Sequence, residues 1–397
     1  MKNQLFATFR SLRSYNFRLW MAGSLVSNIG TWMQRVAQDW LVLTQLTHHD
    51  ASALGIVTGL QFAPQLLLLP WTGSAADRLN QRALLLFTQA AMGVLALLLG
   101  VLTLTGVVRL WHVYVFAFLF GSAAALDAPV RQTFVTEMVG EGDLPNAVAL
   151  NSTSFNAAQM IGPAVAGLLI AGAGMGWAFV CNGLSFAAVL LSLSFFRLSE
   201  LRNSARAHRA RSGFREGLRY VRGRPDLMAI LVMLFLIGTF ALNFPIFIAT
   251  MAVKVFHSGA QAFGLLSSIA AVGSVSGGLF AASRRKPGLL SLAFGSAVFG
   301  LGWTFGALAL AGAASLTLTN GTNSIMQLST DPAMRGRVMA LRVGVALGGM
   351  TLGAPLLGWI ANRFGPRWSL AVGAGACFTA ALVGACVLVR RRKLLLT

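Results

Sequence analysis

A few ionisable side chains inside long apolar segments are the residues of this chain that could do chemistry. Arg35 precedes Asp39 by one helical turn, and Asp127 precedes Arg131 by the same spacing. Ionisable residues at membrane depth are costly to bury, and many of them relay protons. Asp39, Arg35 and Asp127 are therefore candidates for proton coupling. For Asp39 and Arg35, a structural ion pair at the outer membrane interface is the alternative.

Uncharged polar side chains inside the apolar segments form a second group. On the first expected span they recur at spacings of three and four, which places them on one helical face. In lipid, such groups must face other helices or a wet cavity. Interhelical hydrogen bonding and the lining of a substrate passage are both open for them. Together with the neighbouring aromatic residue Phe155, the cavity candidates are Asn28, Thr31, Gln34, Gln38, Gln61, Gln65, Asn151, Asn156, Gln159, Asn243, Asn320, Asn323 and Gln327.

Several other chemistries are excluded by the residues that the sequence lacks. No lysine lies in a Gly-x-x-x-x-Gly-Lys-Ser/Thr loop, which excludes ATP hydrolysis at such a site. The five histidines lie outside the centres of the apolar segments, so no metal cluster is expected within them. No nucleophile–base arrangement appears either. We expect no cofactor, no metal and no enzymatic activity, and an ion gradient remains as the energy source.

The elements that must position these residues are membrane helices. With 56% hydrophobic and 11% charged residues, the chain is not an ordinary soluble protein. Apolar runs of about 20 residues, each long enough to cross a membrane, recur along its length. We expect an all-α, polytopic membrane protein with spans near residues 19–43, 53–76, 83–106, 111–130, 148–172, 176–196, 227–251, 262–282, 288–328, 337–361 and 366–389.

The net charge of +20 comes from basic residues that are concentrated in alternate loops of the expected spans. Nine arginines lie between Arg197 and Arg224, and other basic clusters fall at the N-terminus, in alternate turns and in the C-terminal tail. This positive-inside pattern places both termini and the Arg-rich linker in the cytoplasm. It also predicts contact with anionic lipid headgroups. Nucleic acid is not an expected partner.

The Arg-rich linker divides the chain into two halves with weak internal similarity. We expect an N-terminal bundle over 1–196, a cytoplasmic linker over 197–226 and a C-terminal bundle over 227–397. Asp127-Ala-Pro129-Val-Arg131 in the first half has an echo in Asp331-Pro332-Ala-Met-Arg335 of the second. Gly162-Pro163-Ala-Val-Ala-Gly167 has a similar echo in Gly353-Ala-Pro355-Leu-Leu-Gly358. The shared order of these matches favours a duplication.

Residues 288–328 are long for one span and short for two. A single span would place Arg284-Arg285-Lys286 and Arg335/Arg337 on opposite membrane faces, against the charge pattern. We therefore predict two short helices with a tight outer turn near Phe305 to Ala309. This gives twelve spans, with the ninth and tenth shortened. Eleven spans remain the alternative.

Gly73-Ser-Ala-Ala-Asp77-Arg78-Leu-Asn-Gln-Arg82, after the second expected span, resembles the signature of the major facilitator superfamily. The resemblance implies two six-helix bundles related by a pseudo-two-fold axis. It also implies a cytoplasmic gate formed by Gly73, Asp77, Arg78 and Arg82, with Arg131 as a partner. Gly162, Pro163 and Gly167 are similar to the fifth-helix motif of antiporters, with Ala166 replacing one glycine. Trp32-Met-Gln34 and Arg335-Gly-Arg337 resemble the enterobactin-exporter-like, drug-efflux branch.

What the resemblance implies is a secondary active transporter in the inner (plasma) membrane. It would export small amphipathic molecules of the drug or siderophore type by proton antiport and alternating access. Its expected partners are the small-molecule substrate, protons and anionic lipids, and we expect a monomer. The alternatives are a sugar or metabolite facilitator, and a lipid-handling or non-transporting membrane protein.

Overall fold

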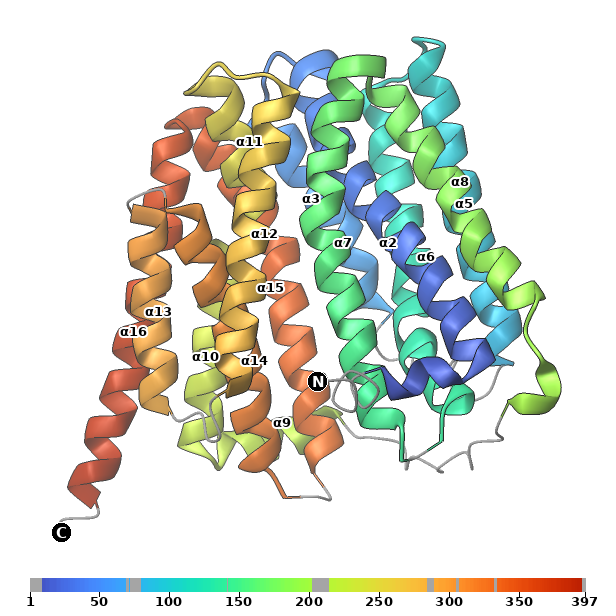
Figure 1. Cartoon of the computed structure of the whole chain (residues 1–397). Coiled ribbons are helices and arrows are strands. Elements are labelled where there is room, and N and C mark those ends of the chain that lie inside the picture. The colour runs from blue at the N-terminus through green and yellow to red at the C-terminus, as the bar shows by residue number, and fades with distance from the viewer. Residues whose placement is uncertain are drawn as a thin grey trace, which may run out of the picture. The chain divides into compact units, whose positions relative to one another are not determined.

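The computed structural model of the chain describes residues 9–68, 71, 80–140, 142–201, 214–283, 289–304, 307–331 and 334–394. The regular structure of these residues is helical (Figure 1). In chain order the α-helices are α2 (Tyr15–Leu41), α3 (Ala51–Leu67), α5 (Gln81–Leu104), α6 (Leu110–Met138), α7 (Leu144–Ala173), α8 (Met175–Ser194), α9 (Phe214–Arg222), α10 (Pro225–Phe240), α11 (Phe244–Lys254), α12 (Ala260–Ser283), α13 (Leu289–Thr304), α14 (Leu308–Leu328), α15 (Arg335–Arg363) and α16 (Pro366–Leu394).

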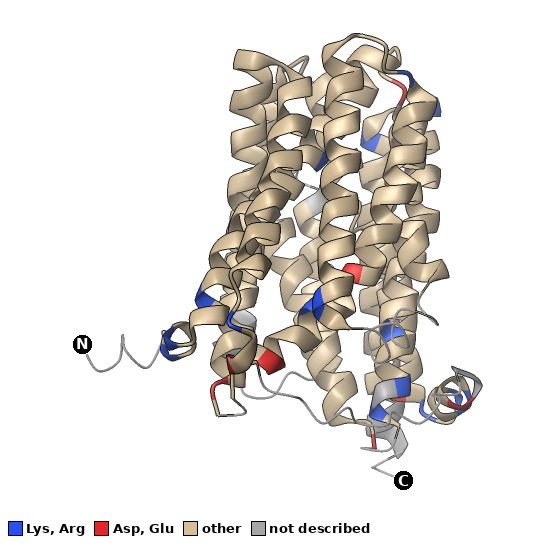
Figure 2. Ribbon diagram, turned by 90° about the vertical axis from the view of Figure 1, so that its right-hand side faces the viewer, with Lys and Arg blue, Asp and Glu red and all other residues tan. Residues whose placement is uncertain are grey.

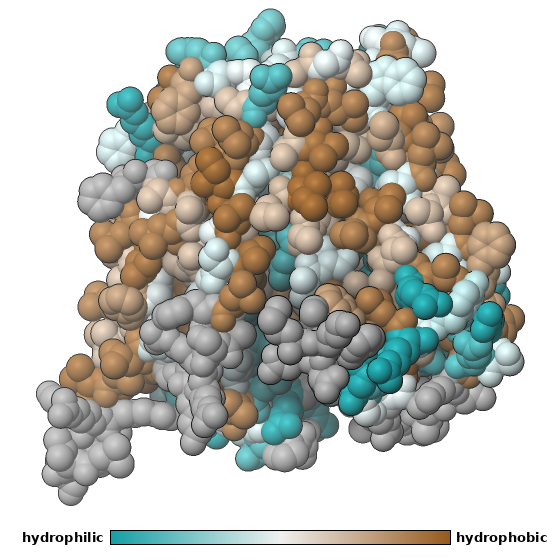
Figure 3. All heavy atoms as spheres, in the orientation of Figure 1, coloured by the Kyte–Doolittle hydropathy of each residue, from teal (hydrophilic) through white to brown (hydrophobic). Residues whose placement is uncertain are grey.

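The length and polarity of these helices suit a bilayer. Among the described residues, eight helical segments are long and apolar enough to cross a membrane. Charged residues concentrate toward the ends of the helices, and few lie along their middle (Figure 2). On the face drawn in Figure 3, hydrophobic side chains cover most of the middle and hydrophilic ones gather toward the ends. This distribution places the least polar surface where hydrocarbon would surround it.

Local sequence signals explain where several helices begin. The Ser14 hydroxyl accepts a hydrogen bond from the Phe17 amide at 3.4 Å and caps α2. Asn80 does the same for α5, accepting from the Ala83 amide at 3.1 Å. Both are favoured N-cap residues because their short side chains satisfy amides that lack partners within the helix. Gly174, with a φ of 95°, separates α7 from α8.

Contacts between helices divide the chain into two compact units. Unit 1 comprises Met1–His48, Leu67–Ala207 and Ser258–Ser268, and unit 2 comprises His49–Leu66, His208–His257 and Ile269–Thr397. Most of α3 therefore packs with helices of the second half, and the first residues of α12 pack with helices of the first half. The division of the chain at the Arg-rich linker stays a prediction.

Unit 1 is built around α2, which packs against α7 and α8, while α5 packs against α6 and α8. At one end of these helices, large apolar side chains form a buried cluster that includes Phe17, Trp20 and Phe134. Trp20 and Phe134 meet edge to face with their ring centroids 6.0 Å apart, a favourable aromatic geometry. The cluster fixes the ends of α2 and α6 beside each other.

Unit 2 contains α10, which packs against α15 and α16, and α13, which packs against α14 and α16. α3 joins this unit through Gly55 and Gly59, which lie so close to Ala354 and Pro355 of α15 that a side chain would collide with them. Close approach through small residues is a usual means of helix association in lipid.

Residues 289–328 form two helices, as predicted. α13 and α14 run antiparallel: Gly302 lies beside Ala311, and Gly295 beside Leu318. The sixteen residues of α13 give a length of about 24 Å. This is short against a hydrocarbon core of about 30 Å.

The structure divides one expected span into two helices. The span expected over 227–251 lies within a candidate membrane span over Pro225–Lys254, in which α10 ends at Phe240 and α11 begins at Phe244. Pro245 near the start of α11 has no amide proton for a continuous helix, which accounts for a break at this point. The echoed residues Asp127 and Asp331 lie in different secondary structure. Asp127 lies inside α6, whereas Asp331 follows the end of α14.

Candidate functional site

Asp127 is the centre of a buried polar cluster in unit 1. Thr88 Oγ1 and Gln89 Nε2, both on α5, donate hydrogen bonds to Asp127 Oδ1 at 2.8 and 2.7 Å. Arg131 Nε, one turn along α6, donates to Asp127 Oδ2 at 3.0 Å. Three donors satisfy this buried carboxylate, and Arg131 supplies the opposite charge. The cluster therefore joins α5 to α6.

Arg131 extends the cluster to α2. Its guanidinium carbon lies 5.2 Å from the centroid of the Trp20 ring, within the range of a cation–π interaction. Its Nη1 atom is buried and has no hydrogen-bond partner among the described residues. Arg131 was predicted to pair with Asp77 of the gate. Gly73, Asp77 and Arg78 lie outside the described residues.

Arg82 is the member of the predicted gate that the structure describes. Its Nε and Nη2 atoms donate to the carbonyl oxygen of Leu193 at 3.1 and 2.8 Å. Leu193 belongs to the last turn of α8, where carbonyl groups lack partners within the helix. A cation is also favourable at this end of the helix dipole. Arg82 thus links the start of α5 to the end of α8.

Asp39 and Arg35 lie near the end of α2 and differ from the Asp127 cluster. Asp39 is buried, with 6% of its surface exposed. Its carboxylate accepts no hydrogen bond from another described residue, and Arg35 acts on it electrostatically. The Arg35 guanidinium lies over the Trp32 ring, 4.7 Å from its centroid. Asp39 is therefore a buried acid without the donors that hold Asp127.

The amides of α2 divide between two roles. Gln34 is buried and accepts a hydrogen bond from Asn182 Nδ2 of α8 at 2.6 Å, which is interhelical bonding. Gln38 is also buried, and its Nε2 atom has no partner among the described residues. Asn28 and Thr31 are half-buried. Only Gln38 thus combines burial with an unsatisfied donor.

α7 carries both the predicted antiporter motif and further cavity candidates. A side chain at Gly162 would collide with Trp32 of α2, and one at Gly167 would crowd the start of α12. Pro163 is buried within the helix. The motif thus permits close packing of α7 on both neighbours. Asn151, Asn156 and Gln159 are half-buried, and Phe155 is exposed with its ring edge-on to Trp32.

In unit 2, two of the predicted cavity amides line a pocket. Asn320 and Asn323 of α14 belong to the lining of a cavity of about 580 Å³. Gln327 lies outside this lining and donates to Asn323 Oδ1 at 3.3 Å. Gln61 and Gln65 of α3 are half-buried. Asn243 is fully buried at the break after α10, where its Nδ2 donates to the Thr239 carbonyl at 2.8 Å.

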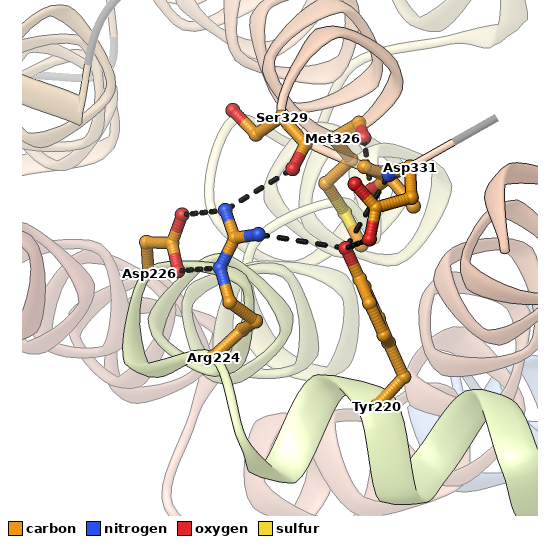
Figure 4. A network of polar contacts seen from close by, with 7 residues as sticks. Tyr220, Arg224, Asp226, Met326, Ser329 and Asp331 are labelled. Atoms are coloured by element: carbon orange, nitrogen blue, oxygen red, sulfur yellow. Dashed lines mark hydrogen bonds and ion pairs between the residues drawn. The ribbon is translucent and has the colours of Figure 1, made fainter.

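A polar network closes one end of unit 2 around Arg224 (Figure 4). Arg224 makes two hydrogen bonds to the carboxylate of Asp226, at 3.1 and 2.9 Å, and a third to the carbonyl of Ser329 at 3.1 Å. Hydrogen bonding to Asp226 raises the pKa of the Arg224 guanidinium above its ordinary value. The Tyr220 hydroxyl donates to Asp331 at 3.0 Å. The network therefore attaches α9 to the connection after α14.

Sequence reasoning missed two residues of unit 2. Arg342 was not among the predicted site residues, but it is buried in α15 and donates to Thr319 and Thr322 of α14 at 2.7 and 3.2 Å. Its position seven residues after the helix start was the available signal. Tyr220 had no such signal, because its partner Asp331 is 111 residues away.

Comparisons with known proteins point to one kind of protein. A family model described as transmembrane secretion effector matches residues 6–394. The staphyloferrin A transporter of Staphylococcus aureus (strain NCTC 8325 / PS 47) is 26% identical over 261 residues, 65% of this chain and 64% of that protein. The chain thus spans slightly less than two thirds of that relative. The enterobactin exporter EntS of Shigella flexneri is 27% identical over 345 residues, 82% of this chain and 80% of that protein.

Solved structures match over nearly the whole chain. A bacterial homologue of the human lysosomal transporter Spinster has a TM-score of 0.74 at 16% identity, covering 94% of this chain and 96% of that chain. A D-xylose–proton symporter has a TM-score of 0.66 at 15% identity, covering 94% and 97%. A bacterial homologue of the iron transporter ferroportin has a TM-score of 0.69 at 15% identity, covering 93% and 98%. At these identities the likeness concerns the fold alone.

Proposed function

The chain belongs to the transmembrane secretion effector family of the major facilitator superfamily, and from this premise we propose that it exports small amphipathic molecules by proton antiport. Membership confirms two predictions: the all-α major facilitator fold, and a transporter rather than an enzyme. The relatives named as siderophore transporters support a siderophore-type substrate. A drug-type amphipath is the second substrate class of the proposal.

The observation that carries proton coupling is the contrast between two buried acids of unit 1. Asp127 has three hydrogen-bond donors, which fix it as a structural carboxylate. Asp39 has no hydrogen-bond donor among the described residues. A buried ionised group without donors is costly, so a change in hydration around Asp39 would drive uptake or release of a proton. We assign the coupling role to Asp39, with Arg35 as its regulator.

The predicted gate and antiporter motif complete the proposal. Rocking between two access states would be controlled by Asp77 and its arginine partners, and the packing at Gly162 and Gly167 would seal one state. The protein would act as a monomer in the plasma (inner) membrane with both termini in the cytoplasm. The basic linker would contact anionic lipid headgroups.

Transport into inside-out vesicles tests the proposal. Vesicles with an acidic interior should accumulate radiolabelled enterobactin or staphyloferrin A, and collapse of the pH gradient should stop this accumulation. The variant Asp39→Asn should accumulate no more substrate than vesicles without a gradient. The matched control is Asp50→Asn. Asp50 accepts from the amides of Ser52 and Ala53 at the start of α3, and asparagine serves as well at such a position.

Two results would contradict the proposal. Accumulation that ignores the pH gradient would exclude proton antiport. Wild-type coupling in Asp39→Asn would remove Asp39 from the carrier role.

A further inference from the structure

A groove of about 580 Å³ runs along α14 within unit 2. Ser276 of α12 and Phe294 of α13 belong to its walls, and α14 lines it from Leu310 to Ser324. Leu310 and Ser324 are fourteen positions apart, which is about 21 Å along a helix. The volume lies within the range of about 300 to 1,000 Å³ that is usual for small-molecule pockets.

Contacts through small residues hold the walls of the groove in place. A side chain at Gly273 of α12 would collide with Ala309 of α14, and one at Gly277 would collide with Ala313. Thr317 Oγ1 of α14 then donates to the carbonyl of Gly277 at 2.9 Å. On the other side, α13 approaches α14 at Gly295. Backbone contact therefore fixes the α12 wall, and the Leu318 side chain of α14 contacts Gly295 of the α13 wall.

The lining changes from apolar to polar along α14. Leu310 lines one end, Val298 of α13 lies level with the middle, and Asn320, Asn323 and Ser324 line the other end. The Asn320 side chain is exposed and makes no hydrogen bond with another described residue. A free amide on a helix in hydrocarbon needs a partner. This end of the groove therefore offers hydrogen-bond donors and acceptors to a ligand.

The described lining residues include none with a charged side chain, and two exposed apolar side chains lie among them. Phe294 is 71% exposed and Leu310 is 42% exposed. Such side chains suit an approach from hydrocarbon rather than from water. An anion entering the groove would lose its hydration and find no cation among the lining residues. The groove thus disfavours carboxylates and sulfonates.

We propose that this groove is a binding site for an uncharged amphipath with an aromatic body and a hydrogen-bonding head. The aromatic body lies along α14 between Leu310 and the level of Val298, and the head bonds to Asn320 and Asn323, near Phe294. Transport of the bound molecule rests on the proposed function, but binding to the groove does not depend on proton antiport.

A pair of fluorescent probes that differ only in charge tests this site. Dansylamide carries an uncharged sulfonamide on a naphthalene ring, and dansylate carries an anionic sulfonate at the same position. Purified full-length protein in nanodiscs should give saturable, blue-shifted dansylamide fluorescence beyond that of empty nanodiscs. Dansylate should bind about tenfold more weakly or worse, because its charge must be desolvated.

Substitutions at the polar end of the groove test whether dansylamide binds there. Asn320→Leu and Asn323→Leu should each weaken dansylamide binding about fivefold, since each removes one hydrogen bond. Ser324→Trp should fill the polar end and abolish saturable binding. Asn362→Leu makes the same chemical change at an exposed position of α15 outside the groove lining and should bind dansylamide like the wild type. Asp39→Asn should also bind normally, so loss of coupling and loss of binding are separable.

Three results would overturn the site. The first is equal affinity of the protein for the two probes. The second is wild-type dansylamide binding by well-folded Asn320→Leu and Asn323→Leu. The third is a lack of saturable dansylamide binding in nanodiscs, either in nanodiscs alone or in detergent as well. Binding that occurs in detergent but is lost in nanodiscs would mean that a lipid occupies the groove.

Discussion

At the scale of residues, the molecule uses buried charge in three ways. Asp127 is held by three donors, Asp39 has none among the described residues, and Arg342 donates to uncharged oxygens of α14. The environment therefore decides the role of each charge. A fully bonded carboxylate is suited to structure, and an unbonded one is suited to proton exchange.

The Asp127 cluster should dominate the stability of unit 1. Asp127→Ala leaves Arg131 buried without its anion, which should lower the free energy of unfolding by about 3 to 5 kcal/mol. Thr88→Val removes one hydrogen bond and should cost about 0.5 to 1.5 kcal/mol. The double variant Asp127→Leu with Arg131→Leu removes both charges and should recover much of the loss. Denaturant titration in mixed micelles measures all three.

Equal losses in Asp127→Ala and Thr88→Val would show that the ion pair contributes nothing beyond a single hydrogen bond. Failure of the double variant to recover stability would place the cost in packing instead.

The sequence places Asp127 and Arg131 four positions apart on one helix, a spacing that allows their ion pair, although Arg131 was predicted to be a partner of Asp77. It could not predict Thr88 and Gln89, which are 39 and 38 residues away and meet Asp127 only through the packing of α5 on α6. Gln34 illustrates the same limit. Helical periodicity showed that it was a polar residue in a span, but only the position of Asn182 on α8 decides that it forms an interhelical hydrogen bond.

At the scale of elements, small residues set the distances between helices. α12 and α14 touch through Gly273, and α10 touches α15 through Gly349 and Gly353, where a side chain would meet the backbone of Thr239. Because lipid gives little hydrophobic drive for helix association, such close contacts supply much of the attraction. They also leave little tolerance for added atoms.

A pair of glycine variants tests this point. Gly273→Ala places a methyl group against the Ala309 backbone and should cost about 1 to 3 kcal/mol of stability through overpacking. Gly375→Ala on α16 meets nothing within 4 Å and should be neutral or stabilise by up to about 1 kcal/mol. Thermal unfolding in detergent distinguishes them. Equal melting temperatures would show that α12 and α14 can separate at little cost.

Most helices could be predicted from hydrophobic runs, since a run of about 20 apolar residues suffices. The hairpin of α13 and α14 followed from the charge pattern. The break between α10 and α11 did not follow, because 227–251 is apolar throughout and a proline is compatible with a kinked span. The apolar segment 227–251 also did not predict that Thr239 packs against α15.

At the scale of the whole molecule, the two compact units do not coincide with the two halves of the sequence. α3 joins the second-half helices, and residues 258–268 join the first-half helices. Sequence alone indicated the halves through the linker and the repeated glycine–proline elements. It could not indicate that α3 and the start of α12 join the other half. A side chain at Gly55 of α3 would collide with Ala354, and one at Gly264 of α12 would collide with Pro163, but a glycine in a sequence does not identify its partner.

The topology is testable with reporter fusions. A fusion after Ala307 should give active alkaline phosphatase outside the cytoplasm, and one after Leu328 should give fluorescent green fluorescent protein inside. The physical reason is that Arg284–Lys286 and Arg335/Arg337 then lie on the same, cytoplasmic side. A fusion at the C-terminus serves as a cytoplasmic control. Fluorescence after Ala307 would contradict the two-helix crossing.

The contacts of Arg224 must form in a fixed order during synthesis of the chain. Ser329 leaves the ribosome 105 residues after Arg224, which takes roughly 5 to 20 s at about 5 to 20 residues per second. During this interval Asp226, which is only two residues away, has already been synthesised and can pair with Arg224. The nascent α10 therefore enters the membrane with its acid already neutralised. α9 reaches its final place only when α14 has been made.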